Sequence, residues 1–181
     1  MTTEYITRKE LLNTLSILTY ENQLVCEVCL ATGIRLSDAL ALRTFALASP
    51  KIKIIEQKTG KQRKFTLSKN LYDRLITNAG SVFVFPHRLD KEKHRTRQAV
   101  WQDFKRAAKA FRIKQNIAPH SLRKIFAVEM MSKNGDLSKI QKVLNHSNEV
   151  TTVLYAFADK LKRNKRNPKA LQGKAYRNIS K

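Results

Sequence analysis

Long apolar runs are missing from this chain of 181 residues. No stretch approaches the run of about 18 apolar residues that would cross a bilayer. The opening residues, Met-Thr-Thr-Glu, do not begin a signal peptide. The sequence therefore predicts a protein with no membrane partner, located in the cytoplasm or, in a eukaryotic host, in the nucleus.

Cysteine is also scarce, with two residues in the whole chain. Cys26 and Cys29 form a C-x-x-C pattern, but no second pair completes a zinc site. They lie within the apolar helical pattern of Leu24, Val25 and Val28, and burial is the commoner use of free cysteine. We therefore expect buried, reduced thiols rather than redox or metal chemistry.

Acidic residues are few: 14 Asp and Glu stand against 36 Lys and Arg, which gives a formal net charge of +22. This excess goes far beyond what solubility requires, so we expect a polyanionic partner, with nucleic acid favoured over an anionic membrane surface. No cluster of carboxylates for two metal ions is apparent, and the sequence predicts no metal or other cofactor. The length and the 42% apolar content suit one domain with an ordinary core.

The spacing of apolar and turn residues predicts a mainly α-helical α+β fold. Thr7 and Glu10 have the spacing of a capping box at the start of a first helix. A second helix through residues 24–31 is expected to end at Gly33, which suits a left-handed cap. Ser37 is expected to cap a third helix.

A small antiparallel β-hairpin is predicted at one edge of this helical fold. Residues 51–57 and 62–67 are strand-like and flank a turn at Gly60. Ser68 is suited to cap the next helix. Residues 82–85 (Val-Phe-Val-Phe) then read as a short strand that a proline ends.

The second half of the chain reads as further helices. One apolar stripe consists of Val100, Trp101, Phe104, Ala108 and Phe111. Its helical period favours core packing over base stacking for Trp101. Another helix is expected to begin after Pro119 and to end at Gly135.

A change in composition marks the end of the predicted domain. Residues 159–181 contain nine basic residues and one acidic residue. We therefore divide the chain into a domain over residues 1–158 and a basic tail over residues 159–181.

A set of polar residues follows an order that suits chemistry on a phosphate. Its members are Arg35, Lys58, His120, Arg123, His146 and Tyr155. A phosphodiester resists attack because its anionic oxygens repel a nucleophile and its leaving alkoxide is a strong base. The planar forks of two arginines suit the nonbridging oxygens, and His120 is a candidate base for the phenol of Tyr155. The set therefore predicts metal-free cleavage of DNA through a phosphotyrosine.

Each of these residues also has a purely structural interpretation. A surface position is the ordinary alternative for an arginine, and core packing is the alternative for Tyr155. Lys61 and Lys64 lie near Lys58, and a solvated lysine is common on a hairpin. Asp38, which lies outside this set, has the ordinary interpretation of a carboxylate at a helix N-terminus.

Three segments carry a resemblance to a known family. They are residues 31–38 (Ala-Thr-Gly-Ile-Arg-Leu-Ser-Asp), residues 119–123 (Pro-His-Ser-Leu-Arg) and residues 144–147 (Leu-Asn-His-Ser), followed by Thr151, Thr152 and Tyr155. Together they resemble the tyrosine recombinases, the phage integrase family. The resemblance implies that Tyr155 is the nucleophile, that Lys58 protonates the departing 5′ oxygen and that His146 hydrogen-bonds the phosphate or that oxygen. It also implies that Asp38 orients a basic partner.

The resemblance implies a site-specific DNA recombinase or integrase that works through a 3′-phosphotyrosyl intermediate without metal or ATP. Its partners would be double-stranded DNA and further copies of the chain, from dimer to tetramer. A type IB topoisomerase and a catalytically silent DNA-binding regulator are the alternatives. Asn145 stands where the family usually has glycine, and Asp38 replaces a commoner glutamate. The early position of Arg35 implies a short form consisting of the catalytic domain alone.

Overall fold

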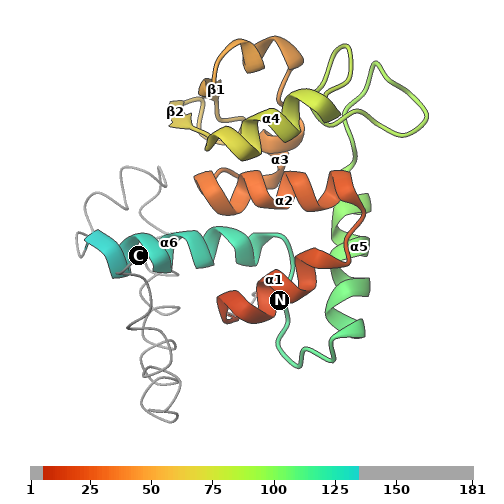
Figure 1. Ribbon diagram of the computed structural model, residues 1–181, viewed down its shortest axis with the longest axis vertical. Coiled ribbons are helices and arrows are strands. Elements are labelled where there is room, and N and C mark those ends of the chain that lie inside the picture. Colours follow the sequence, from red (N-terminus) through yellow and green to blue (C-terminus); the bar gives the residue numbers. More distant parts are fainter. Residues whose placement is uncertain (1–5, 135–181) are drawn as a thin grey trace, which may run out of the picture.

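The computed structural model describes residues 6–134. This part of the chain is mainly α-helical with one two-stranded antiparallel sheet (Figure 1), as the sequence predicts. The elements are α1 (Arg8–Ser16), α2 (Tyr20–Thr32), α3 (Leu36–Leu40), the 3-10 helix η1 (Thr44–Ala48), β1 (Lys51–Ile55), β2 (Gln62–Thr66), α4 (Lys69–Asn78), α5 (Arg97–Ala110) and α6 (His120–Asn134). None of the described helices is long and apolar enough to cross a membrane.

Helix α2 lies at the centre of the described structure. Figure 1 shows it between α4 and α6, and it also contacts α1 and α3. Leu24, Val25 and Val28 are fully buried, so apolar side chains occupy most of its circumference rather than one stripe. Cys26 and Cys29 are buried free thiols, as predicted, and burial raises the pKa of the Cys29 thiol to about 12.

The predicted signals at helix ends are confirmed at several positions. Thr7 Oγ1 accepts a hydrogen bond from the Glu10 amide at 3.2 Å, and Glu10 Oε2 accepts one from the Thr7 amide at 2.8 Å, which completes the capping box. Gly33 ends α2 with a φ of +67°, the left-handed conformation that favours glycine. Ser68 caps α4. These features depend on neighbouring residues alone.

The prediction that Ser37 caps the third helix is wrong. Helix α3 begins at Leu36, its N-cap is Arg35, and no side chain makes a capping bond there. The Arg35 side chain instead donates to Glu56, which is distant in the sequence. A tertiary contact therefore outweighs the local capping preference at this helix start.

The predicted hairpin is present. β1 and β2 pair along their whole length, with Ile54 opposite Arg63, and Gly60 lies in the connecting turn with a φ of +65°. The strand predicted at residues 82–85 is absent, because this segment makes one isolated bridge, between Phe83 and Arg43. A single bridge leaves the segment an ordered loop rather than a sheet strand.

Helix α5 buries a narrower stripe than predicted. Val100 and Phe104 are fully buried, and Ala108 is nearly so. Trp101 and Phe111 are 43% and 41% exposed, so their assignment to the core is wrong. Trp101 is rotated by about 100° around the helix axis from Val100, which carries its ring out of the buried stripe.

Candidate active site

Four of the residues predicted to act on a phosphate line one cleft of about 850 Å³. Arg35 precedes α3, Lys58 belongs to the β1–β2 turn, and His120 and Arg123 lie in the first turn of α6. The first residues of α5, including Trp101, complete the wall. His146 and Tyr155, the other predicted members, lie outside the described residues.

The guanidinium of Arg35 is held by carboxylates at the floor of the cleft. Its Nη1 lies 3.0 Å from Glu56 Oε2 and 3.9 Å from Asp38 Oδ2. The side chain is 12% exposed. Gly33 and the short helix α3 fix the backbone on either side of it. Arg35 therefore presents a charged group at a nearly desolvated surface, where electrostatic interactions are stronger than in water.

Glu56 is the main site residue that the sequence interpretation missed. It is completely buried, and it accepts hydrogen bonds from Arg35 Nη1 at 3.0 Å, Thr59 Oγ1 at 2.9 Å and Arg63 Nη1 at 3.3 Å. The alternation of inward-facing and outward-facing residues along β1 could have revealed Glu56. Ile52 and Ile54 are the inward-facing residues of β1, and the next inward position is Glu56.

Arg63 is the second charged residue on the inward face of the hairpin. It is buried on β2 and donates both to Glu56 and to the carbonyl oxygen of Thr32. Burial, followed by the charge of Arg123, lowers the pKa of its guanidinium, and Glu56 opposes this effect. Glu56 thus lies between the positive charges of Arg35 and Arg63.

Arg123 is buried and anchored to the end of the central helix. Its Nη1 donates to the carbonyl oxygen of Gly33 at 2.6 Å. The carbonyls of Thr32 and Gly33 belong to the C-terminal end of α2, where unpaired carbonyls and the helix dipole favour cations. The end of α2 therefore holds Arg63 and Arg123 in place together. His120, one turn earlier than Arg123, is exposed.

Asp38 contacts both Arg35 and the hairpin. Its carboxylate is buried, and Oδ1 accepts a hydrogen bond from the amide of Gln57 at 3.0 Å. Gln57 immediately precedes Lys58. Asp38 therefore anchors the backbone that carries Lys58 and lies near Arg35, so it is more than a carboxylate at a helix end.

The three candidate lysines of the hairpin, Lys58, Lys61 and Lys64, differ in position. Lys58 lines the cleft, whereas Lys61 and Lys64 are absent from its wall. Lys64 lies opposite Lys53 on the exposed face of the two strands. Of these three lysines, Lys58 is therefore the one that shares the cleft with Arg35, His120 and Arg123.

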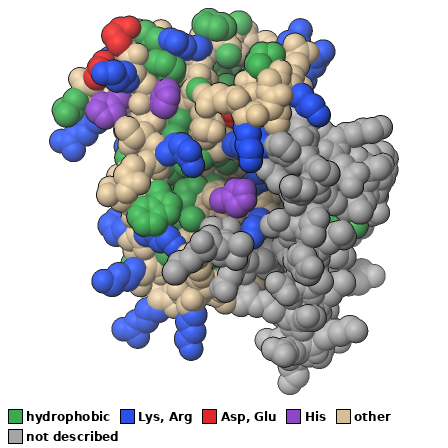
Figure 2. All heavy atoms as spheres, turned by 180° about the vertical axis from the view of Figure 1, so that it is seen from behind, with side chains coloured by type: hydrophobic (Ala, Val, Ile, Leu, Met, Phe, Trp, Pro, Cys, Tyr) green, Lys and Arg blue, Asp and Glu red, His purple; other side chains and the backbone are tan. Residues whose placement is uncertain are grey.

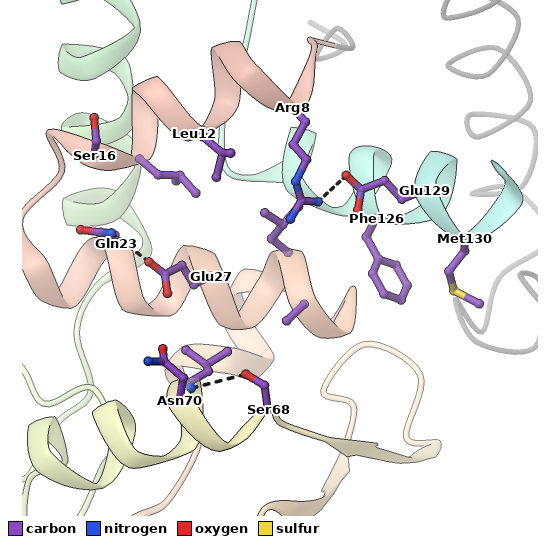
Figure 3. A pocket seen from close by; sticks show the side chains of 14 residues that line it. Arg8, Leu12, Ser16, Gln23, Glu27, Ser68, Asn70, Phe126, Glu129 and Met130 are labelled. Atoms are coloured by element: carbon purple, nitrogen blue, oxygen red, sulfur yellow. Dashed lines mark hydrogen bonds and ion pairs between the residues drawn. The ribbon is translucent and has the colours of Figure 1, made fainter. Parts of the chain in front are cut away.

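A second cavity, of about 500 Å³, lies between α1, α2, α4 and α6 (Figure 3). Arg8 on α1 and Glu129 on α6 form an ion pair of 2.5 Å at its edge, and Phe126 and Met130 contribute apolar wall. Arg35, Lys58, His120 and Arg123, the described members of the predicted set, do not line this cavity. Lys and Arg side chains greatly outnumber acidic ones on the face drawn in Figure 2.

The family model described as "Phage integrase family" matches residues 4–162. The chain belongs to the phage integrase family. Its curated relatives include the integrase of Escherichia phage P2, which is 27% identical over 156 residues, and the tyrosine recombinase XerD of Staphylococcus aureus, which is 29% identical over 154 residues. These alignments cover 85% and 78% of this chain but 43% and 51% of the relatives, so the chain spans about half of their length.

The fold of this phage integrase family member is also found in solved structures. A lambda integrase dimer bound to a COC′ core site matches 99% of this chain and 52% of its own chain, with a TM-score of 0.72 and 16% identity. At that identity the match establishes the shared fold. It agrees with the mainly helical architecture and the small antiparallel sheet.

Gly33→Ala is expected to destabilise the fold. Gly33 has a positive φ, and a Cβ there would overlap the ring of Phe126 on α6. We expect the free energy of unfolding to fall by about 1–3 kcal/mol for the backbone strain alone, and by more for the overlap. Urea denaturation measures this loss.

Gly60→Ala is the matched control for that substitution. Gly60 has a similar φ of +65°, but nothing lies within 4 Å of the point that a Cβ would occupy. It should lose only the cost of the backbone conformation, the same cost of about 1–3 kcal/mol as at Gly33, without the added cost of an overlap. Equal losses in the two variants would contradict a close fit between Gly33 and Phe126.

Proposed function

We propose that this chain is the catalytic part of a site-specific DNA recombinase that cleaves and rejoins strands through Tyr155. The supporting observation is that Arg35, Lys58, His120 and Arg123, from three separate segments, line one cleft. Each carries a group that binds an anionic oxygen or moves a proton. A net charge of +22 supports double-stranded DNA as the source of the phosphate.

In the first step the phenol oxygen of Tyr155 attacks phosphorus and the bond to the 5′ oxygen breaks. A phenol with a pKa near 10 is about one part in a thousand ionised at neutral pH, a penalty of roughly 4 kcal/mol. His120 takes the phenol proton, and Lys58 gives a proton to the departing oxygen. The product is a 3′-phosphotyrosyl bond and a free 5′ hydroxyl.

The two arginines stabilise the charge that develops during this attack. Arg35 and Arg123 bind the nonbridging oxygens, and both are buried or nearly so and held by fixed partners before DNA arrives. Such preorganised donors lower the barrier because they need no rearrangement in the transition state. His146 hydrogen-bonds the phosphate or the leaving oxygen, and Asp38 supports Arg35 and the Lys58 turn.

Rejoining is the reverse reaction with a different 5′ hydroxyl as the nucleophile. The phosphotyrosyl bond conserves the energy of the broken phosphodiester, so exchange of strands needs no ATP. Exchange between two duplexes requires several active sites, which is why we propose a dimer or tetramer on DNA. Residues 1–158 form the catalytic unit in this proposal, and the basic residues 159–181 contact DNA or a neighbouring protomer.

The test uses nicked duplexes tiled across the DNA that flanks the gene of this protein. A duplex nicked just beyond the cleaved phosphate releases a short fragment and traps the covalent adduct. We expect a protease-sensitive, denaturant-resistant adduct, and recombinant products from intact partner duplexes. Topoisomers without recombinants would indicate a topoisomerase, and binding without an adduct would indicate a silent regulator.

Adduct formation is expected to persist in excess EDTA. Arg35, Arg123 and Lys58 supply the positive charge and the proton that a metal ion and its bound water would otherwise supply. The adduct yield with chelator at roughly a thousandfold excess over trace metal should equal that with magnesium. Loss of the adduct on chelation and its return with magnesium would contradict the metal-free mechanism.

A further inference from the structure

Glu56 joins two parts of the cleft that the sequence places far apart. Its Oε2 accepts from Arg35 Nη1 at 3.0 Å and from Thr59 Oγ1 at 2.9 Å. Thr59 is the residue next to Lys58. One carboxylate oxygen therefore contacts both an arginine of the cleft and the turn that carries the cleft lysine.

The surroundings of Glu56 restrict its movement. It is completely buried, and its other oxygen accepts from Arg63 at 3.3 Å. Its backbone closes the turn, since the Glu56 amide donates to the Lys61 carbonyl at 3.0 Å and the Gly60 amide donates to the Glu56 carbonyl at 2.8 Å. A carboxylate bound from several sides stays in one rotamer, and the groups that donate to it share that order.

Glu56 also offsets part of the positive charge of the arginines around it. Arg35, Arg63 and Arg123 are all buried or nearly so, and the charges of Arg123 and Arg35 both contribute to lowering the pKa of Arg63. Within residues 6–134, the ion pairs to this group come from Glu56 and Asp38. These five side chains together carry one unit of positive charge, so the carboxylates offset most of the repulsion between the arginines and leave a positive charge that attracts a phosphate.

We propose that Glu56 is a positioning residue that couples Arg35 to Lys58, so that phosphate binding and protonation of the leaving oxygen occur in one geometry. This inference rests on the proposed function. Glu56 itself does not touch the reacting atoms. It acts through Arg35 on one side and through Thr59 on the other.

The effect of Glu56 on Arg35 and its effect on Lys58 can be separated with a substrate whose leaving oxygen is replaced by sulfur. A thiolate leaves without a proton because it is a far weaker base than an alkoxide. Sulfur therefore compensates for a misplaced Lys58 but not for a misplaced Arg35. The probe is the nicked duplex that captures the wild-type protein, made with oxygen or with sulfur at the mapped position.

Glu56→Gln keeps the shape of the side chain but replaces one acceptor with an amide that donates. At saturating DNA we expect single-turnover cleavage of the oxygen substrate to fall about 100-fold, the size of effect seen when one preorganised donor is lost. The sulfur substrate should recover part of this loss, and DNA affinity should stay close to wild type. Glu56→Gln leaves the buried Arg63 without its carboxylate partner, so the double variant Glu56→Gln, Arg63→Met tests the same point without that unpaired charge.

Thr59→Val tests the link from Glu56 to Lys58 separately from the link to Arg35. It removes the hydroxyl that donates to Glu56 and leaves the contact between Glu56 and Arg35 in place. We expect a loss of about 10-fold on the oxygen substrate, equivalent to one hydrogen bond of roughly 1.4 kcal/mol, and full recovery with sulfur. Asp103→Asn is the control for general destabilisation, because Asp103 binds Thr19 and Asn22 away from the cleft.

The result that supports the coupling is partial recovery with sulfur in Glu56→Gln, full recovery in Thr59→Val and unchanged cleavage by folded Asp103→Asn. Wild-type cleavage rates in folded Glu56→Gln would overturn the inference and leave the proposed function intact. A defect in Glu56→Gln that sulfur does not change would also overturn it, because Glu56 would then act on Arg35 alone. No adduct with the wild-type protein would reject the proposed function itself.

Discussion

Tyr155→Phe is expected to abolish covalent capture of DNA while leaving DNA binding nearly unchanged. The substitution removes one oxygen and keeps the ring, so the largest cost to folding is one hydrogen bond, about 1 kcal/mol. Without the phenol oxygen no phosphotyrosyl bond forms, and the loss of adduct should be complete. The nicked duplex that traps the wild-type protein measures it, and peptide mapping of the wild-type adduct should place the nucleotide on Tyr155.

Tyr72→Phe is the matched control. The phenol of Tyr72 donates to the carbonyl oxygen of Leu47 at 2.5 Å, so this substitution costs a structural hydrogen bond without touching the cleft. It should lower stability by about 1 kcal/mol and leave the adduct yield of the folded protein unchanged. Tyr20, on α2, is likewise absent from the cleft wall.

Tyr176 is the main competitor because it lies in the basic tail, from which a nucleophile could reach the cleft of another protomer. An adduct that survives Tyr155→Phe and disappears with Tyr176→Phe would overturn the assignment. Mixing Tyr176→Phe with Arg123→Ala would then distinguish attack within one protomer from attack on its neighbour, because only attack on a neighbour would give an adduct in the mixture.

The parts of the fold that could be predicted from sequence are those set by near neighbours. The capping box at Thr7, the left-handed end of α2 at Gly33 and the hairpin turn at Gly60 each depend on residues within one or two turns of chain. The start of α3 could not be predicted this way. Its N-cap, Arg35, is held by Glu56 across the fold, and no local pattern contains that contact.

Some features of the candidate site could likewise be predicted from the sequence, and others could not. His120 and Arg123 share the first turn of α6, so their common direction followed from helical spacing. The strand period also contained Glu56 and Arg63 as two charged residues on an inward face, but their partnership depends on the strand register. The assignment of Trp101 to the core was wrong for a different reason. An apolar helical period does not distinguish a residue of the buried stripe from one in the wall of a cleft, where Trp101 lies.

Lys58→Ala is expected to slow cleavage of ordinary DNA by roughly a thousandfold, within the usual range for loss of a general acid. Lys58 is exposed and lines the cleft with Arg35, His120 and Arg123. Without it, the 5′ oxygen must leave as an alkoxide. Replacement of that oxygen by sulfur removes the need for a proton and should restore cleavage to near the wild-type rate.

Lys61→Ala and Lys64→Ala are the controls, because both lysines belong to the same hairpin and carry the same charge. Neither lines the cleft, so each should show a weaker salt dependence of DNA binding without selective recovery on sulfur. Selective recovery in Lys61→Ala would move the acid role to Lys61. Equal impairment of Lys58→Ala on both substrates would mean that Lys58 binds the DNA backbone and that the proton reaches the leaving oxygen from another group.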